Sequence, residues 1–296
     1  MSTPRSSLLT LSLLTLLSGC RWNSEPKGTD AGTPKAAAPT GPQRQLTVKG
    51  SDTLVVLGQR WAERFIQRHP HVRIQVTGGG SGTGLAALIN GTTDIAMSSR
   101  RIQDTEREQL RRHHPQGPVE LPVARDGITF YVHESNPVHS LTVAQLRAIY
   151  QGDITGWKDV GGDDAPIVAY SRENSSGTYL FVRDELLGGE DFSERVLTLP
   201  GTAAVVHAVA LERQGIGYGG AAYAKGVRVL EVKRDAQSAP IPPTEETIRD
   251  GTYPLSRDLF FYLPQEATGT TRAFLDYVLS SEGQKIVTET GYFPVK

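Results

Sequence analysis

Residues 171–178 have the sequence SRENSSGT and lie between two apolar runs. The run before them, residues 167–170 (IVAY), has the composition of a strand, and residues 179–186 can form the apolar side of a short helix. The first N–H groups of a helix lack internal partners and carry the positive end of its dipole, so they suit an oxyanion. We therefore interpret residues 171–178 as an anion-binding turn that includes Arg172. An ordinary Ser/Thr helix cap beside a surface arginine is the alternative.

Three other expected strands end in similar turns. Residues 46–48 lead into GSDT (50–53), residues 72–77 into GGGSGTG (78–84), and residues 95–97 into SSR (98–100). Helical spacing resumes after the first two turns, through residues 57–65 and 85–89. Four such strand ends, two of them with an arginine, favour one shared anion site over four unrelated helix caps.

Composition limits the possible partners and cofactors. The 296 residues are enough for one large or two modest domains. The 31 Lys and Arg nearly balance the 32 Asp and Glu, so the chain lacks the basic footprint of a nucleic-acid-binding protein. Any anion site must therefore be local. The single cysteine excludes an intrachain disulfide and a Cys-based metal site.

The first 20 residues predict an export signal. An apolar run at residues 8–17 follows Arg5 and is too short to form a stable membrane-spanning helix. It ends in LSGC, which resembles a bacterial lipobox and predicts that Cys20 is lipidated as the first mature residue. The alternative is a signal peptide cut elsewhere. Residues 21–44 are rich in Pro, Gly, Ala, Thr and Lys, and predict a disordered tether.

The folded part is expected to begin at Gln45 and to alternate strands with helices. This alternation predicts an α/β fold with a mostly parallel sheet and ligands at the carboxyl ends of the strands. Further helices are expected at residues 104–113, 143–150, 203–213 and twice between 271 and 287, and strands near residue 216 and at 227–232.

Two long strand candidates, residues 121–132 and 253–263, bracket the central part of the chain. They predict two α/β lobes joined by a two-strand hinge, with the ligand in the cleft between the lobes. The expected division places residues 45–124 and 252–296 in lobe 1 and residues 125–251 in lobe 2.

Enzymatic motifs are incomplete. Residues 82–87 (GTGLAA) match a dinucleotide fingerprint, but the next expected strand ends in SSR and not in the acidic residue that the motif requires. Leu85 stands where a nucleotide phosphate loop needs lysine, and Ser81 is not in a G-x-S-x-G elbow. The seven histidines include no H-E-x-x-H spacing. We therefore expect no enzyme activity, no cofactor and no metal site.

These turns resemble those of the phosphate-binding proteins of bacterial ABC phosphate importers, a family of type II periplasmic solute-binding proteins. The similarity extends from Gln45 to Lys296 and is most specific at residues 50–53, 78–84, 93–100 and 172–178. It implies a monomeric receptor of the periplasm or cell envelope, anchored to the membrane by lipid. Such a receptor captures inorganic phosphate and delivers it to the permease subunits of an ABC transporter.

The resemblance assigns the ligand residues position by position. The family's serine in the Gly-rich turn falls on Ser81, its arginine on Arg172, and its Ser-Gly-Thr helix start on residues 176–178. The family's first threonine corresponds to Thr53 or, without a gap, to Asp52. The expected ligand residues are Ser51, Asp52, Thr53, Ser81, Ser99, Arg172, Ser176, Gly177 and Thr178.

Two departures from the family concern selectivity. Ser99 stands where well-known members have an aspartate that accepts a phosphate proton, and Asn174 where they have an acid beside the arginine. Near neutral pH phosphate keeps a proton and sulfate keeps none, so a buried acceptor penalises sulfate. Ser99 can accept that proton or donate one, and Asp52 or Asp126 can supply the carboxylate instead. A binder of sulfate, molybdate or tungstate and an exported phosphatase-like enzyme remain alternatives.

Overall fold

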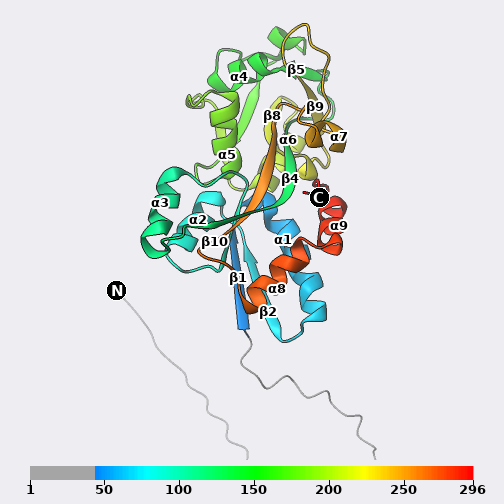
Figure 1. Ribbon diagram of the computed structural model, residues 1–296. Helices are drawn as coiled ribbons and strands as arrows, with labels where there is room; N and C mark the ends of the chain where they lie inside the picture. The colour runs from blue at the N-terminus through cyan, green and yellow to red at the C-terminus, as the bar shows by residue number, and fades with distance from the viewer. Residues whose placement is uncertain (1–43, 296) are drawn as a thin grey trace, which may run out of the picture. The chain divides into compact units, whose positions relative to one another are not determined.

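The computed structural model describes residues 44–295, in which strands and helices alternate (Figure 1). The strands are β1 (Arg44–Gly50), β2 (Val72–Thr77), β3 (Ile95–Ser98), β4 (Val119–Val132), β5 (Ser140–Thr142), β6 (Val168–Arg172), β7 (Leu197–Leu199), β8 (Gly215–Gly220), β9 (Arg228–Lys233) and β10 (Ser256–Leu263). The α-helices are α1 (Asp52–Arg68), α2 (Ser81–Ile89), α3 (Asp104–His113), α4 (Val143–Gln151), α5 (Gly177–Phe181), α6 (Thr202–Leu211), α7 (Glu245–Arg249), α8 (Gly269–Val278) and α9 (Ser281–Thr290). The shorter turns are the 3-10 helices η1 (Trp157–Val160) and η3 (Ala221–Tyr223) and a π-helical turn, η2 (Val182–Leu186), that continues α5.

The α/β class expected from the sequence is confirmed, and α3, α4 and α6 lie within two residues of their predicted bounds. The predicted export signal, Cys20 and the tether lie outside the described residues, apart from Arg44, which begins β1. Within the described part of the chain, no helix has the length and apolar character needed to cross a membrane.

The sheet follows the order β2-β1-β3-β10-β4-β8-β6-β7, with β9 paired to both β4 and β5. The expected mostly parallel arrangement holds within β1–β3 and within β6–β8. It fails at β4 and β10, which run antiparallel to each other. In addition, β4 runs antiparallel to β8, and β10 runs antiparallel to β3. The reason is the path of the chain, because β4 carries it out of the first part of the sheet and β10 brings it back.

β4 belongs to both halves of this sheet. Up to Gly127 it pairs with β10, and from Ile128, which lies opposite Gly220, it pairs with β8. Asp126 lies opposite Arg257 just before this exchange of partners. The polypeptide therefore crosses between the halves at the point where two charged residues face each other.

The two largest hydrophobic clusters of the described residues define two lobes. The first lobe is centred on Trp61 and Phe65 of α1, and Phe65 meets Phe274 of α8 at a ring-centroid distance of 5.4 Å. The second contains Tyr150 and Tyr218, whose ring centroids lie 5.4 Å apart. Figure 1 shows β4 and β10 running together from one lobe into the other. Residues 253 and 255 pack in the second core, so we propose that the return crossing begins with β10.

Candidate functional site

Four turns at strand ends supply a group of buried hydroxyls. Thr53 follows β1, Ser81 follows β2, Ser99 follows β3, and Thr178 lies in the first turn of α5, after β6. All four residues are almost completely inaccessible to solvent. A buried hydroxyl needs hydrogen-bond partners, so the contacts among these residues determine what the site can bind.

Ser81 and Ser99 form a pair at the first-lobe side of the site. The backbone N–H of Ser99 donates to Ser81 Oγ over 3.0 Å, and the two Oγ atoms lie 3.3 Å apart. Ser81 begins α2 after Gly80, whose φ of 92° is a backbone conformation that favours glycine. The Gly-rich sequence therefore serves to turn the chain so that Ser81 faces Ser99.

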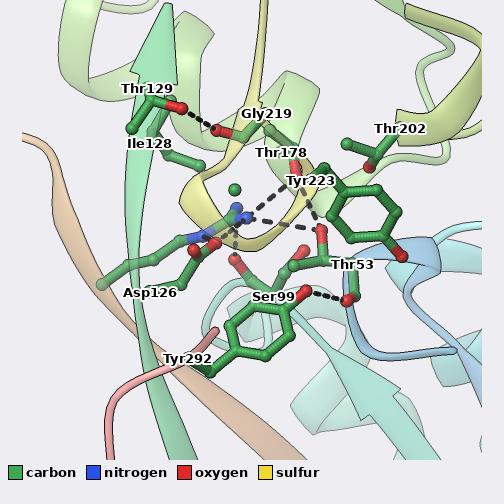
Figure 2. A network of polar contacts seen from close by, with 12 residues as sticks. Thr53, Ser99, Asp126, Ile128, Thr129, Thr178, Thr202, Gly219, Tyr223 and Tyr292 are labelled. Atoms are coloured by element: carbon green, nitrogen blue, oxygen red, sulfur yellow. Dashed lines mark hydrogen bonds and ion pairs between the residues drawn. The ribbon is translucent and has the colours of Figure 1, made fainter. Parts of the chain in front are cut away.

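The second lobe meets these hydroxyls directly. Thr178 Oγ1 lies 3.2 Å from Thr53 Oγ1 (Figure 2). A Cβ atom on Gly177 would lie 2.4 Å from Ser81 Oγ and 2.7 Å from Ser99 Oγ, which is closer than any real Cβ contact. Glycine at position 177 is therefore what allows the turn of residues 176–178 to approach both serines.

Arg172 is buried, with 1% of its side chain exposed. Its Nε and Nη2 donate to both carboxylate oxygens of Glu173, at 3.1 and 3.0 Å. Nη1 donates to Thr202 Oγ1 at 2.7 Å, and Nη2 donates to Asp52 Oδ2 at 2.8 Å. These bonds use four of the five N–H donors of the guanidinium, so one is left for a ligand in this arrangement.

Asn174, which stands where the resembled family has an acid beside the arginine, is exposed. Glu173 pairs with Arg172 instead. Desolvation is the largest influence on the pKa of Glu173 and raises it, but the hydrogen bonds and charge of Arg172, with the backbone N–H of Gly201, lower it further than desolvation raises it. The carboxylate therefore stays ionised beside the arginine. This pairing was not predicted from the sequence, although the two residues are adjacent in the chain.

Asp52 connects the two lobes. Its Oδ1 accepts the N–H of Gly79 at 2.9 Å, and its Oδ2 accepts from Arg172. Its carbonyl oxygen accepts the hydroxyl of Tyr223 at 2.7 Å. Both carboxylate oxygens are engaged by donors from the protein, so the geometry favours Thr53 over Asp52 as the ligand-facing residue of the first turn.

Two predicted site residues occupy the N-cap positions of helices. Ser176 Oγ accepts the N–H groups of Thr178 and Tyr179, at 3.2 and 3.3 Å, so these two donors of α5 are used by the protein. Ser51 is buried at the N-cap of α1 but makes no side-chain cap hydrogen bond there. Its backbone N–H donates to the carbonyl of Met97 at 2.9 Å, which ties the turn to β3.

Arg257 and Asp126 form an ion pair among the hydroxyls of the site, which the sequence did not predict. Arg257 Nη2 donates to Asp126 Oδ2 at 2.9 Å, to Thr178 Oγ1 at 3.0 Å and to Thr53 Oγ1 at 3.4 Å. Its Nη1 donates to the carbonyl of Ser99 at 2.9 Å. Figure 2 shows Asp126, Thr53, Thr178 and Ser99 around this network. From the sequence, Asp126 is expected only as a possible proton acceptor, and no role is predicted for Arg257.

The Asp126 carboxylate is fully buried. Burial raises its pKa, and Arg257 and the N–H groups of Ala221 and Gly127 oppose that rise. Oδ1 of Asp126 has no hydrogen-bond partner of good geometry among residues 44–295. A second arginine is thus held at the centre of the hydroxyl group by a carboxylate that only it neutralises.

Arg100, the arginine of the third predicted turn, points elsewhere. Its guanidinium forms a two-pronged ion pair with Glu106 of α3, at 2.6 and 2.8 Å. It therefore stabilises the start of a helix and does not join the hydroxyl group. Among the described residues, no cluster of three or more His, Cys, Asp or Glu side chains is placed to hold a metal ion.

Known proteins are similar to this chain in sequence. A family model described as a PBP superfamily domain matches residues 35–282. The phosphate-binding protein PstS of Pseudomonas aeruginosa is 34% identical over 283 residues, which cover 90% of this chain and 88% of that protein. The PstS protein of Staphylococcus haemolyticus is 32% identical over 253 residues, covering 82% of this chain and 79% of that protein.

Solved structures give the same result. A protein of Clostridium perfringens described as a phosphate ABC transporter substrate-binding protein, solved with bound phosphate, superposes with a TM-score of 0.78 at 30% identity. The alignment covers 86% of this chain and 100% of that one. An ABC-type phosphate transport receptor from Vibrio cholerae superposes with a TM-score of 0.68 at 29% identity, covering 84% and 99%.

Proposed function

The chain belongs to the PstS phosphate-binding proteins of the PBP superfamily, and on this basis we propose that it captures inorganic phosphate between its lobes and delivers it to an ABC importer. The observation that carries the proposal is the group of four buried hydroxyls beside Arg172, contributed by both lobes. A tetrahedral oxyanion has acceptor oxygens on every side, so a cleft that offers donors from two directions encloses it well.

Phosphate contacts are proposed for Thr53, Ser81, Ser99, Arg172, Gly177 and Thr178. Ser81 receives the N–H of Ser99, so its own O–H is free to donate to an anion. Ser176 is proposed to contribute its hydroxyl proton, because its oxygen already accepts two N–H groups. Ser51 and Asp52 are proposed to shape the turn and the closed cleft rather than to touch the ligand.

Ser99 is proposed as the group that accepts the phosphate proton. Among the hydroxyls of the site, Ser81 Oγ accepts a backbone N–H and Thr178 Oγ1 accepts from Arg257. Within residues 44–295 the Ser99 hydroxyl has a single hydrogen-bond partner, Ser81 Oγ. If the Ser99 hydroxyl donates to Ser81, both lone pairs of Ser99 can face the ligand. A proton on phosphate then finds an acceptor, while fully ionised sulfate meets an unfavourable lone pair.

We further propose that the protein is a monomeric, non-enzymatic lipoprotein of the periplasm or cell envelope, held to the membrane through Cys20. The apolar run that ends in LSGC supports the lipid anchor. Catalysis by a serine would need a histidine beside it as a base. His133 Nδ1 does lie 2.8 Å from Ser135 Oγ, but both residues belong to the segment after β4 and not to the hydroxyls of the site, which supports a binding role.

The test is calorimetric titration of the purified protein, in the form that the cell produces, with phosphate, arsenate, sulfate and molybdate. We expect tight binding of phosphate, with a stoichiometry of one, and weaker binding of sulfate and molybdate. Tighter binding of sulfate or molybdate than of phosphate would show that the ligand is another oxyanion. Release of phosphate from a phosphomonoester by the same protein would favour the enzyme alternative.

A further inference from the structure

The hydroxyls of Thr53 and Thr178 are each able to donate one hydrogen bond and to accept two. With only each other as neighbours, one of them would donate to the other across the 3.2 Å between their oxygens. That arrangement would direct a lone pair, and not a proton, towards an anion. A site for a dianion therefore needs a further group that determines which way these hydroxyls point.

Arg257 is such a group, because a guanidinium donates hydrogen bonds and accepts none. One N–H of its Nη2 donates to Asp126. The other is shared between Thr178 Oγ1 at 3.0 Å and Thr53 Oγ1 at 3.4 Å, so it engages a lone pair on each oxygen. With those lone pairs engaged, both hydroxyl protons can turn to a ligand. The cation also strengthens each hydroxyl as a donor by polarising its oxygen.

Asp126 fixes the position of Arg257. It lies opposite Arg257 in the register of β4 and β10, and its Oδ2 accepts from Nη2 at 2.9 Å and from Nε at 3.3 Å. On its other side the guanidinium donates to the carbonyl of Ser99, and it lies 5.5 Å from the ring centroid of Phe181. The side chain is thus held from three directions, with its remaining contacts on the two threonines.

We propose that Arg257, positioned by Asp126, sets the hydroxyls of Thr53 and Thr178 as hydrogen-bond donors to the bound anion. This rests on the proposed capture of phosphate and assigns a positioning residue to the same site. Since Thr53 belongs to the first lobe and Thr178 to the second, one buried cation on the crossing strand prepares both walls of the cleft.

A double-mutant cycle on phosphate affinity tests the proposal. Arg257→Gln alone would leave Asp126 buried without a partner, so the charge pair is removed together as Asp126→Asn/Arg257→Gln. This paired variant is made in the unmodified chain and in a Thr178→Val chain, which keeps the shape of the side chain without its hydroxyl. Phosphate affinity is measured by calorimetry, and thermal unfolding without ligand confirms that each variant is folded.

In the unmodified chain the paired variant is expected to weaken phosphate binding about tenfold or more, the size of effect typical of a hydrogen bond to a charged group. In the Thr178→Val chain the same change is expected to cost much less, because the hydroxyl through which Arg257 acts is gone. An equal loss in both chains would overturn the proposal, as would no loss in either.

A matched control is the neighbouring ion pair of the same two strands. Arg125 and Asp258 lie opposite each other at 3.3 Å and are partly exposed, at 39% and 35%. Arg125→Gln/Asp258→Asn is expected to leave phosphate affinity unchanged. If it lowered phosphate affinity as much as Asp126→Asn/Arg257→Gln does, the effect would come from the pairing of the strands, and the proposal would be overturned. Failure of the unmodified protein to bind phosphate would instead contradict the proposed function.

Arg257→Lys is a second test variant, in which the positive charge beside Asp126 is kept. A lysine ammonium has the same charge but lacks the planar fork that reaches Asp126, Ser99 and Thr178 together. Phosphate affinity is therefore expected to fall although the variant is folded. Full affinity in Arg257→Lys would mean that only the charge matters, which would overturn the positioning role.

Discussion

The backbone N–H of Ser99 donates to Ser81 Oγ over 3.0 Å, while the side-chain oxygen of Ser99 lies 3.3 Å from the same atom. Ser81 Oγ therefore accepts the backbone N–H of its neighbour. In the proposed arrangement the Ser99 hydroxyl also donates to Ser81, so Ser81 donates to the ligand and Ser99 offers its lone pairs.

Replacement of Ser99 is predicted to change selectivity more than stability. Ser99→Ala removes the acceptor for the phosphate proton, so phosphate binding should weaken while sulfate binding is kept or improved. Ser99→Asp introduces a stronger acceptor and should suppress sulfate binding further. The ratio of the two affinities should shift about tenfold for each 1.4 kcal/mol of discrimination gained or lost.

Titration of both variants with phosphate and sulfate at one pH provides the measurement. Ser98→Ala is the matched control, because Ser98 Oγ donates to the carbonyl of Arg100 within the protein. That variant should keep the original ratio. A ratio that stays constant in Ser99→Ala would exclude Ser99 as the acceptor and leave Oδ1 of Asp126 as the remaining candidate.

Asp52→Asn is predicted to weaken the closed form of the protein. The carboxylate is the first-lobe partner of Arg172, whereas Glu173 binds the same guanidinium from within the second lobe. Asp52 is 21% exposed, so screening by solvent reduces the effect, and we expect phosphate affinity to fall about tenfold. The loss should be similar for sulfate, since closure favours either anion.

Glu173→Gln is the matched comparison for Asp52→Asn. The Glu173 carboxylate and Arg172 belong to the same lobe, so their contact persists when the lobes separate. Loss of this contact should therefore lower the stability of the ligand-free protein more than it weakens the closure of the lobes. X-ray scattering with and without saturating phosphate should show less compaction for Asp52→Asn than for Glu173→Gln. Equal compaction in the two variants would argue against Asp52 as a contact that holds the lobes together.

Gly177→Ala is predicted to abolish tight binding without unfolding the protein. The added methyl would meet Ser81 Oγ at 2.4 Å and Ser99 Oγ at 2.7 Å, contacts that exist only while the two lobes touch. The ligand-free protein can relieve them by opening. Affinity for phosphate should fall by about a hundredfold or more, the equivalent of about 3 kcal/mol of overpacking.

The readout for Gly177→Ala is calorimetry together with thermal unfolding in the absence of ligand. Gly156→Ala is the control, since a Cβ there makes only ordinary contacts, the nearest at 3.4 Å. Neither variant should unfold much earlier than the original protein. Normal phosphate binding by Gly177→Ala would contradict the closed arrangement of residues 176–178 against the serines.

Cys20→Ala is predicted to release the protein from membranes. If Cys20 carries acyl chains, each buried CH₂ contributes about 0.8 kcal/mol to anchoring, and two or more chains hold a protein firmly. The unmodified protein should therefore sediment with membranes in cells that lack the importer, and Cys20→Ala should not. Phosphate affinity should be the same in both. Membrane association that survives the substitution would rule out Cys20 as the anchor.

Much of the site could be predicted because its signals are local. Gly beside Ser or Thr at a strand end indicates a turn in which hydroxyls face one way, and it predicted Thr53, Ser81 and Thr178. Ser99 was predicted from the two consecutive serines that end its strand. An arginine in such a turn predicted a site residue less reliably. Arg172 is buried among the site residues, whereas Arg100 pairs with Glu106, and the two cannot be distinguished without knowing which way each side chain points.

Arg257 could not be located by such signals because its role depends on a residue 131 positions away. One clue was present. Both crossing strands contain the dipeptide Arg-Asp, at residues 125–126 and 257–258, and an antiparallel pairing of equal pairs places each arginine opposite an aspartate. The expectation of a mostly parallel sheet concealed this, since only the antiparallel direction produces the reciprocal arrangement.

The contacts between the lobes have a mechanical consequence for unloading. Separation of the lobes would break Asp52 from Arg172, Thr53 from Thr178, and the N–H of Gly82 from the carbonyl of Ser175 in one movement. Since several of these groups also form the wall around the anion, opening dismantles the wall instead of merely uncovering it. A membrane partner that pulls the lobes apart would thus convert the work of pulling directly into lost affinity, and no second trigger would be needed for release.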